Sequence, residues 1–287
     1  MLHLKDLYPF FLISAFDISN ASVGKTNFIE DHINKAISRG ITILMDSGNY
    51  ESYWKTSDWS QKDFHSVLGK SSCPMVFCYD NQSPPQDIDK HKGIILSNWQ
   101  EDIKYSNGNI LIPIIHGTKE SIPELCQYVA LETKSLIVAV PERRLGDGII
   151  ERAHTVAKIR SALNENGKYT KLHLLGTGNP ISMAVYSIMG ANSFDGLEWC
   201  QTVVDPETAF LFHFSQAELF FDKSGYENED LPFVLKTLVH NIEFYSNWMR
   251  QLQDAIRSDM AIEFCENRFS PNVFSKISKS LFWRKSS

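Results

Sequence analysis

The sequence lacks the features of a membrane or secreted protein. No apolar run approaches the roughly 20 residues that span a bilayer. The first residues do not form a basic stretch followed by an apolar stretch and a small-residue cleavage site. The five cysteines are odd in number and irregularly spaced, which argues against a disulfide framework. We therefore expect a cytoplasmic protein with reduced thiols and no membrane partner.

Positive charge and common catalytic motifs are also scarce. The chain has 28 Lys and Arg against 34 Asp and Glu, so the totals show no broad basic face for phosphates, although a local one is compatible with them. It contains no Walker lysine, no nucleophile elbow and no His-Glu-x-x-His motif. No Cys/His grouping has structural zinc spacing, and Cys73 and Cys78 are expected in the core. The sequence therefore predicts neither a metal nor a cofactor.

What the sequence does contain is an alternation of short apolar runs and amphipathic stretches. Nearly continuous apolar runs are typical of parallel strands that are covered on both faces. Amphipathic stretches separate them, for example Phe28–Ser38, Ile122–Thr133 and Gly148–Asn164. This alternation predicts parallel strands with right-handed crossovers. The runs are Phe10–Asp17, Ile41–Gly48, Met75–Asn81, Ile110–Gly117, Ser135–Glu142, Leu172–Gly178 and Ser193–Cys200.

We predict that these elements form one (β/α)8 TIM barrel. The chain length of 287 residues suits an α/β barrel in a single domain. An eighth strand or a hairpin is expected within Ala209–Phe221, and a long helix over Phe233–Ile256. The predicted domain covers residues 1–274, and the Ser- and Lys-rich residues 275–287 are expected to form a mobile tail. An open doubly wound sheet is the rival fold.

Polar residues stand where the apolar runs end. Asp46, Asp80 and Asp195 occupy the ends of the second, third and seventh runs, and His116 the end of the fourth. In a barrel the carboxyl ends of all strands meet at one mouth. A single aspartate after a strand is more often a helix cap or a turn residue. Three of them at strand ends nevertheless predict an active site, because carboxylates are rarely buried without a partner or a task.

Several segments match, in order, the motifs of one enzyme family. Asp46–Glu51 looks like the family's Asp-Ser-Gly-Gly-Phe-Gln, and Ile114–Gly117 lies where the family has Ile-Val-Gln-Gly. Leu174–Pro180 is similar to its Leu-Met-Gly-Val-Gly-Thr-Pro, Gly190–Asp195 to its Gly-x-Asp-x-Phe-Asp, and Leu238–Tyr245 to the start of its last helix. On these segments the sequence resembles the tRNA-guanine transglycosylases, including their relatives that insert 7-deazaguanine bases into DNA.

The resemblance implies a base-exchange reaction with a covalent intermediate. Asp195 would attack the sugar C1′ and displace guanine, and Asp46 would act as the general acid and base. Asp80 would accept hydrogen bonds from the N1–H and the exocyclic amine of a guanine-type base. The implied partners are guanine or a 7-deazaguanine base and a nucleic acid, whose target nucleotide has to leave its stack. The remaining base-binding residues implied are Ser47, Gly48, His116, Gly117, Val140, Leu175 and Gly176.

The sequence departs from the family at some of these positions. Asn49 replaces a glycine and His116 a glutamine, and Val140-Pro141-Glu142 stands where the family has a Gly-Gly-Leu-type strand end. The family's tRNA-modifying members bind zinc through three cysteines and a later histidine. His240 matches that histidine, but residues 226–236 contain no cysteine. We therefore expect no zinc and favour DNA slightly over tRNA as the substrate.

Two other functions remain open from the sequence. A nucleosidase or glycosylase would resolve the Asp195 adduct with water, using the same general base. A non-catalytic partner subunit would keep the fold for binding only, although the presence of both Asp46 and Asp195 argues against it. The oligomeric state, whether a homodimer or a complex with a heteromeric partner, also stays open.

Overall fold

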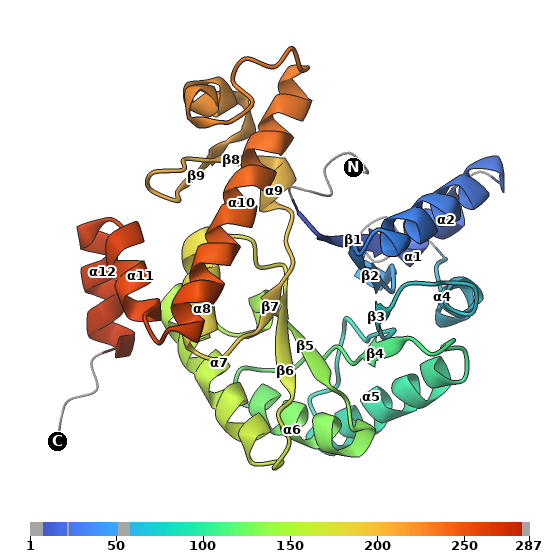
Figure 1. The fold of residues 1–287 in the computed structure, drawn as a ribbon. Coiled ribbons are helices and arrows are strands. Elements are labelled where there is room, and N and C mark those ends of the chain that lie inside the picture. Colours follow the sequence, from blue (N-terminus) through green and yellow to red (C-terminus); the bar gives the residue numbers. More distant parts are fainter. Residues whose placement is uncertain (1–7, 22, 51–57, 283–287) are drawn as a thin grey trace. The chain divides into compact units, whose positions relative to one another are not determined.

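The protein has a mixed α/β fold, drawn as a ribbon in Figure 1. The computed structural model describes residues 8–21, 23–50 and 58–282. Within these ranges no helix is long and apolar enough to cross a membrane. The predicted α/β class with parallel strands is confirmed.

The chain forms two compact units. The first comprises residues 1–144 and 159–173, and the second comprises residues 145–158 and 174–287. The chain passes from one unit to the other within α7 (Ile149–Asn164) and within β6 (Lys171–Leu175), so these two elements belong partly to each.

A four-stranded parallel sheet organises the first unit. Its order is β1-β2-β3-β4, and Ser14 at the end of β1 lies opposite Asp46 at the end of β2. A parallel bridge between Ile114 and Ala139 connects the segment after β4 to β5. The carboxyl ends of neighbouring strands therefore lie side by side. The strands are β1 (Phe10–Ser14), β2 (Thr42–Asp46), β3 (Met75–Phe77), β4 (Ile110–Ile112) and β5 (Ile137–Pro141).

Two helices of the first unit, α4 and α5, begin at side-chain caps. Ser60 and Asp63 form a capping box at the start of α4, and the Asp87 carboxylate accepts a hydrogen bond from the Lys90 N–H at the start of α5. A cap of this kind typically stabilises a helix by about 1 kcal/mol. The caps fix where each loop ends and its helix begins. The helices are α1 (Ala15–Asn20), α2 (Val23–Ser38), α4 (Gln61–Leu68), α5 (Ile88–Ile103) and α6 (Ile122–Thr133).

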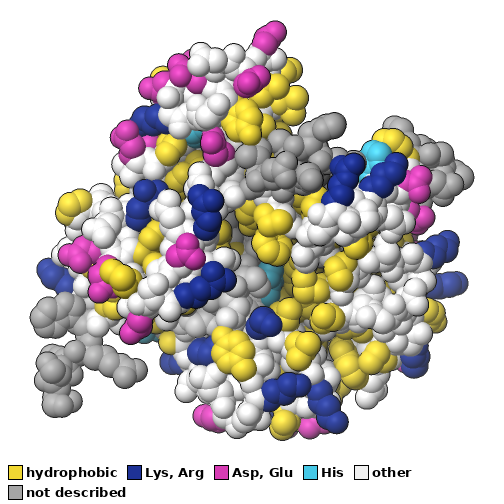
Figure 2. All heavy atoms as spheres, in the orientation of Figure 1, with side chains coloured by type: hydrophobic (Ala, Val, Ile, Leu, Met, Phe, Trp, Pro, Cys, Tyr) yellow, Lys and Arg dark blue, Asp and Glu magenta, His cyan; other side chains and the backbone are white. Residues whose placement is uncertain are grey.

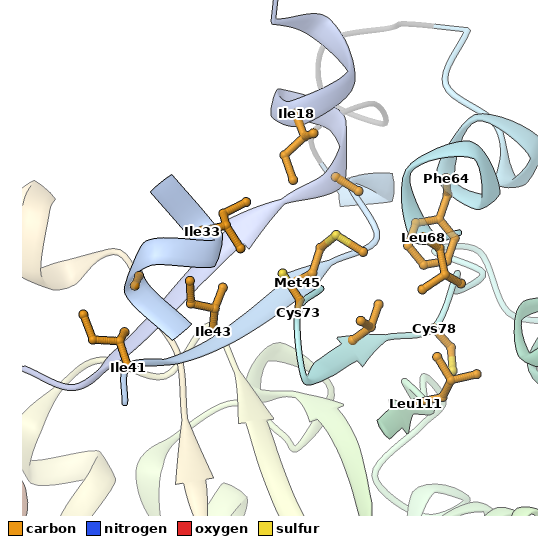
Figure 3. Packing of buried hydrophobic residues seen from close by; sticks show 13 residues of the cluster. Ile18, Ile33, Ile41, Ile43, Met45, Phe64, Leu68, Cys73, Cys78 and Leu111 are labelled. Atoms are coloured by element: carbon orange, nitrogen blue, oxygen red, sulfur yellow. The ribbon is translucent and has the colours of Figure 1, made fainter. Parts of the chain in front are cut away.

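A hydrophobic core joins α1, α2 and α4 to the sheet, as Figure 3 shows. Met45 of β2 and Phe64 and Leu68 of α4 are fully buried within it. Burying a large apolar side chain contributes roughly 1.5–3 kcal/mol. Cys73 and Cys78 belong to the same cluster, which confirms their predicted place in the core.

A long helix, α10 (Phe233–Arg257), organises the second unit. Its Trp248 is fully buried, stacks on Phe244 and meets the ring of Phe264 edge-on. The other elements of this unit are α8 (Pro180–Ile188), β7 (Ser193–Phe194), α9 (Glu198–Gln201), β8 (Thr202–Val204), β9 (Leu211–His213), the 3-10 helix η3 (Phe214–Lys223), α11 (Ala261–Arg268), α12 (Pro271–Ile277) and η4 (Ser278–Phe282).

One buried amide fastens α10 to the segment that contains α9 and β8. The Asn241 Nδ2 donates to the carbonyl oxygens of Trp199 and Thr202, and its Oδ1 accepts from the Val204 N–H. The neighbouring His240 is also buried, with its Nε2 2.9 Å from the Val204 carbonyl oxygen. The position that matches the family's zinc-binding histidine thus contacts the backbone of β8.

The first turn of α10 carries exposed hydrophobic side chains. Phe233, Val234 and Leu235 are 41%, 55% and 50% exposed. Figure 2 shows hydrophobic side chains gathered over this end of the helix. Thr237, by contrast, is fully buried. In the first turn, Phe233 meets the rings of Phe214 and Phe221 edge-on, and the fully buried face of α10 begins at Thr237.

Most of the predicted elements are confirmed, but the predicted strand Ser193–Cys200 is a strand only as far as Phe194, because the helix α9 begins at Glu198. The predicted helices Ile122–Thr133 and Phe233–Ile256 correspond to α6 and α10. Of the strand or hairpin expected within Ala209–Phe221, the strand is confirmed as β9, which pairs antiparallel with β8, a strand that precedes this range. The strand β9 has only three residues, and the rest of that run belongs to the 3-10 helix η3. Residues 275–282 belong to α12 and η4. The single domain over residues 1–274 and the mobile tail stay predictions.

Candidate functional site

A tight turn after β2 holds Asp46, Ser47 and Gly48. The Asp46 Oδ2 accepts a hydrogen bond of 2.9 Å from the Gly48 N–H. Gly48 has a φ of +78°, and a Cβ at this position would lie 2.5 Å from the Cβ of Phe16. The buried Ser47 uses its carbonyl oxygen to accept from the Trp59 indole N–H at 3.0 Å. Only glycine fits at position 48, and the turn therefore fixes the half-exposed Asp46 at the strand end.

A buried aspartate and a buried histidine meet at the ends of β3 and β4. The Asp80 Oδ2 lies 2.6 Å from the His116 Nε2, and the two side chains are 3% and 2% exposed. The Asn49 Nδ2 donates to the Asp80 Oδ1 at 3.0 Å and to the Asp80 carbonyl oxygen at 2.7 Å. Asn49, Asp80 and His116 follow three neighbouring strands, so the predicted convergence of Asp80 and His116 is confirmed.

An outer layer of polar side chains covers Asp80. The Gln82 Nε2 donates to the Asp80 Oδ2 at 2.7 Å, and the Gln82 Oε1 accepts from the Arg143 guanidinium at 2.7 Å. The Arg144 guanidinium donates to the Gln82 carbonyl oxygen at 3.1 Å. Arg143 also lies over the Tyr50 ring, 5.3 Å from its centroid. Both arginines belong to the 3-10 turn η2 (Glu142–Arg144), which follows β5 directly.

A small cavity lies on the inner side of the Asp80–His116 pair. It is lined by the ends of β3 and β4 and by α5, including Asp80, His91, Asn98 and His116. Its volume of about 10 Å³ is close to the lower limit for one water molecule. Burial lowers the pKa of the His91 imidazole, and the neighbouring His116 lowers it further. The cavity is too small for a nucleobase.

A second buried carboxylate positions the backbone next to Asp80. Asp102 in α5 is fully buried and accepts hydrogen bonds from the His65 Nε2, the Gln61 Nε2 and the Tyr79 N–H at 2.8, 2.9 and 2.8 Å. Burial raises the pKa of the Asp102 carboxyl, and the three hydrogen bonds oppose that shift. Asp102 therefore anchors the residue that precedes Asp80 in the chain.

Asp102 is not among the site residues predicted from the sequence. One signal was available, because Ile95, Asn98 and Asp102 lie at helical spacing on one face of α5. An acid on the buried face of a helix predicts a partner or a task.

In the second unit, Asp195 follows β7 and contacts the end of β6. Its Oδ1 accepts a 2.6 Å hydrogen bond from the Gly176 N–H, and its carbonyl oxygen accepts from the Thr177 N–H at 2.5 Å. The Tyr245 hydroxyl of α10 donates to the Gly178 carbonyl oxygen at 2.7 Å. The half-exposed Asp195 is thus held by the turn that also contains Leu175 and Gly176.

The predicted site residues fall into one group in each unit. Gly117 and Val140 also belong to the group in the first unit, but their surroundings are those of residues with a packing role. Val140 is fully buried in β5, and a Cβ at Gly117, whose φ is +148°, would lie 2.8 Å from the Ser121 Oγ. Their role in base binding stays a prediction. The first unit holds Asp46, Ser47, Gly48, Asp80, His116, Gly117 and Val140; the second holds Leu175, Gly176 and Asp195. Glu51, which ends the first motif, lies outside the described residues.

Comparison with known proteins identifies no family. No protein-family model matches the chain, and no curated protein matches it significantly. Among the described residues, no group of three or more His, Cys, Asp or Glu side chains could hold a metal ion.

Proposed function

We propose that the protein is a base-exchange transglycosylase that replaces guanine by a 7-deazaguanine-type base in a nucleic acid, on a (β/α)8 barrel scaffold. The observation that carries the proposal is the buried Asp80 carboxylate, held by Asn49 and His116 at adjacent strand ends and next along the sheet to the Asp46 turn. A carboxylate in this setting suits a ligand with adjacent N–H donors, such as the Watson–Crick edge of guanine.

The proposed reaction is a double displacement. The Asp195 carboxylate attacks C1′ of the target nucleotide, the C1′–N9 bond breaks, and a glycosyl-aspartate ester forms. The Asp46 carboxyl protonates the departing guanine. It then takes a proton from the incoming base, whose N9 attacks C1′ and releases Asp195. The 2.6 Å hydrogen bond from the Gly176 N–H supports this role by orienting the Asp195 carboxylate.

Trapping of the covalent adduct tests the proposal. Wild type is incubated with labelled duplex DNA or tRNA, with and without added guanine, and then denatured and resolved on a gel. We expect an adduct with wild type and none with Asp195→Asn, because an amide is a poor nucleophile. Asp46→Asn should slow turnover by about 10²–10⁴-fold, the usual contribution of general acid/base catalysis.

Matched controls separate catalysis from folding and from hydrolysis. Asp147→Asn changes an exposed aspartate in the same unit as Asp195 and should trap like wild type. Release of guanine that leaves an abasic site in the labelled nucleic acid, even with added guanine, would identify a glycosylase instead. Equal trapping by wild type and Asp195→Asn would refute the proposed mechanism.

A further inference from the structure

The amide of Gln82 bridges Asp80 and Arg143. Its nitrogen donates to the Asp80 Oδ2 at 2.7 Å, and its oxygen accepts from the Arg143 guanidinium at 2.7 Å. One amide group thus satisfies a carboxylate on one side and a guanidinium on the other. Any molecule that takes its place must offer an N–H donor beside a carbonyl acceptor.

Gln82 is the donor that a ligand can displace. Asp80 has three side-chain donors, of which His116 is almost fully buried. The Asn49 Nδ2 also donates to the Asp80 carbonyl oxygen at 2.7 Å, so Asn49 stays in place even when its hydrogen bond to the carboxylate is broken. Gln82 is half-exposed and is held from outside by the exposed Arg143. Rotation of the Gln82 side chain therefore uncovers the Asp80 Oδ2 without disturbing the buried pair.

A lactam has the same pair of polar atoms as the Gln82 amide. In guanine, N1–H and C6=O are joined at one carbonyl carbon, as the nitrogen and oxygen of a primary amide are, so their spacing is equivalent. We propose that Arg143 is a specificity-determining residue that donates to the carbonyl oxygen of a lactam base while Asp80 accepts from the adjacent N–H. In this structure the Gln82 amide holds the position between Asp80 and Arg143 that the base would take.

The position of Arg143 does not depend on Gln82 alone. The guanidinium lies 5.3 Å from the centroid of the Tyr50 ring. A cation held over an aromatic face keeps part of its attraction when a hydrogen-bond partner leaves. Arg143 is therefore in place to bind the incoming carbonyl once Gln82 rotates away. The same arrangement rejects adenine-type bases, which have no carbonyl at this edge and an acceptor in place of N1–H.

This inference rests on the proposed function and is tested by ligand affinity. Calorimetry measures the affinity of wild type, Arg143→Ala, Gln82→Ala and Asp80→Asn for guanine and for 6-thioguanine. The thio analogue keeps N1–H but replaces the carbonyl oxygen by sulfur, a weak acceptor. Arg39→Ala is the matched control, because Arg39 is an exposed arginine that precedes β2 at the opposite end of the strand from Asp46.

We expect wild type and Arg39→Ala to prefer guanine over 6-thioguanine. Arg143→Ala should weaken guanine binding by about tenfold or more, the usual effect of losing a hydrogen bond to a charged group, and should abolish that preference. Gln82→Ala should bind guanine at least as tightly as wild type, because no internal amide competes. Thermal unfolding of each variant shows that the fold is retained.

The outcomes distinguish this inference from the proposed function. If Arg143→Ala weakens both bases equally, or if Gln82→Ala weakens guanine binding, the assignment of Arg143 is wrong. If wild type does not bind guanine, or if Asp80→Asn binds it as wild type does, the proposed function itself fails. Loss of affinity in Asp80→Asn with an unchanged guanine preference in Arg143→Ala overturns only the inference.

Discussion

Replacement of Asp102 tests whether a buried carboxylate holds the backbone next to Asp80. Asp102 is fully buried and has three donors: two side chains of α4 and the Tyr79 N–H. We compare Asp102→Asn, which keeps the shape, with Asp102→Leu, which removes every acceptor. The two variants separate the loss of charge from the loss of the hydrogen bonds.

The expected costs follow from the partners. In Asp102→Asn the amide oxygen can accept from the Tyr79 N–H, while the amide nitrogen faces Gln61 and His65. Gln61 can flip its amide and His65 can change tautomer, so both can become acceptors. Because burial already raises the pKa of the Asp102 carboxyl, removing the charge also recovers part of a desolvation cost. We expect a loss of about 1–2 kcal/mol in the free energy of unfolding, the range for a rearranged buried hydrogen bond.

Asp102→Leu should cost more, because the Tyr79 backbone N–H cannot flip or turn to solvent. Breaking a buried charged network from one side typically costs about 3–5 kcal/mol. Urea denaturation of both variants, followed by circular dichroism, measures the two losses. If Asp102→Leu is as stable as Asp102→Asn, the three hydrogen bonds contribute nothing net and the anchoring role of Asp102 is refuted.

Two further predictions concern the same unit. Gly48→Ala should destabilise the protein by more than Gly40→Ala, because both glycines have positive φ (+78° and +81°) but only the Cβ at position 48 would meet Phe16. The left-handed backbone alone costs about 1–2 kcal/mol, so equal losses in urea denaturation would refute the close approach of Phe16. Burial lowers the pKa of His91, so the folded state binds a proton at this residue less readily than the unfolded state does. The neutral imidazole therefore contributes stability that is fully present above the unfolded pKa of about 6.5. That contribution is lost as the pH falls through the lower pKa of the folded state. His91→Gln should therefore lose less stability on acidification below pH 6.5 than wild type or the exposed-site control His154→Gln, and parallel curves of melting temperature against pH would contradict this.

Strands and helices that pack on their neighbours were predictable from the sequence. The predicted run Ser135–Glu142 contains β5, because a strand buried by neighbours is apolar along its length. The helix predicted over Phe233–Ile256 is α10 almost residue for residue, since its packed face repeats at helical spacing. β8 (Thr202–Val204) was missed, because three residues after the seventh run carry too little pattern to separate them from a turn.

The residues that come together in the candidate site were predictable only where the ends of neighbouring strands place them. Asp80 and His116 follow neighbouring parallel strands, so their convergence could be predicted from the sequence, whereas the hydrogen bond between them was not predicted. The contact of Gln82 with Arg143 joins residues far apart in the sequence through two flexible side chains. No spacing rule predicts such a pair, because long side chains from a loop and a 3-10 turn can reach many partners.

The burial of Asp80 accounts for the hydrogen bond that it accepts from Gln82. A carboxylate that is 3% exposed has little contact with water, and an unsatisfied buried charge is costly. A site that uses such a group to receive a ligand must therefore satisfy it in the empty state by other means. Here a half-exposed amide two residues along the chain does so, and its oxygen at the same time satisfies Arg143. The chemistry of that substitute is constrained by the same hydrogen-bond groups that would select the ligand. For this reason the hydrogen bonds of Gln82 bear on the proposed specificity: a group that satisfies both Asp80 and Arg143 has the donor and acceptor pattern that the proposed ligand would need.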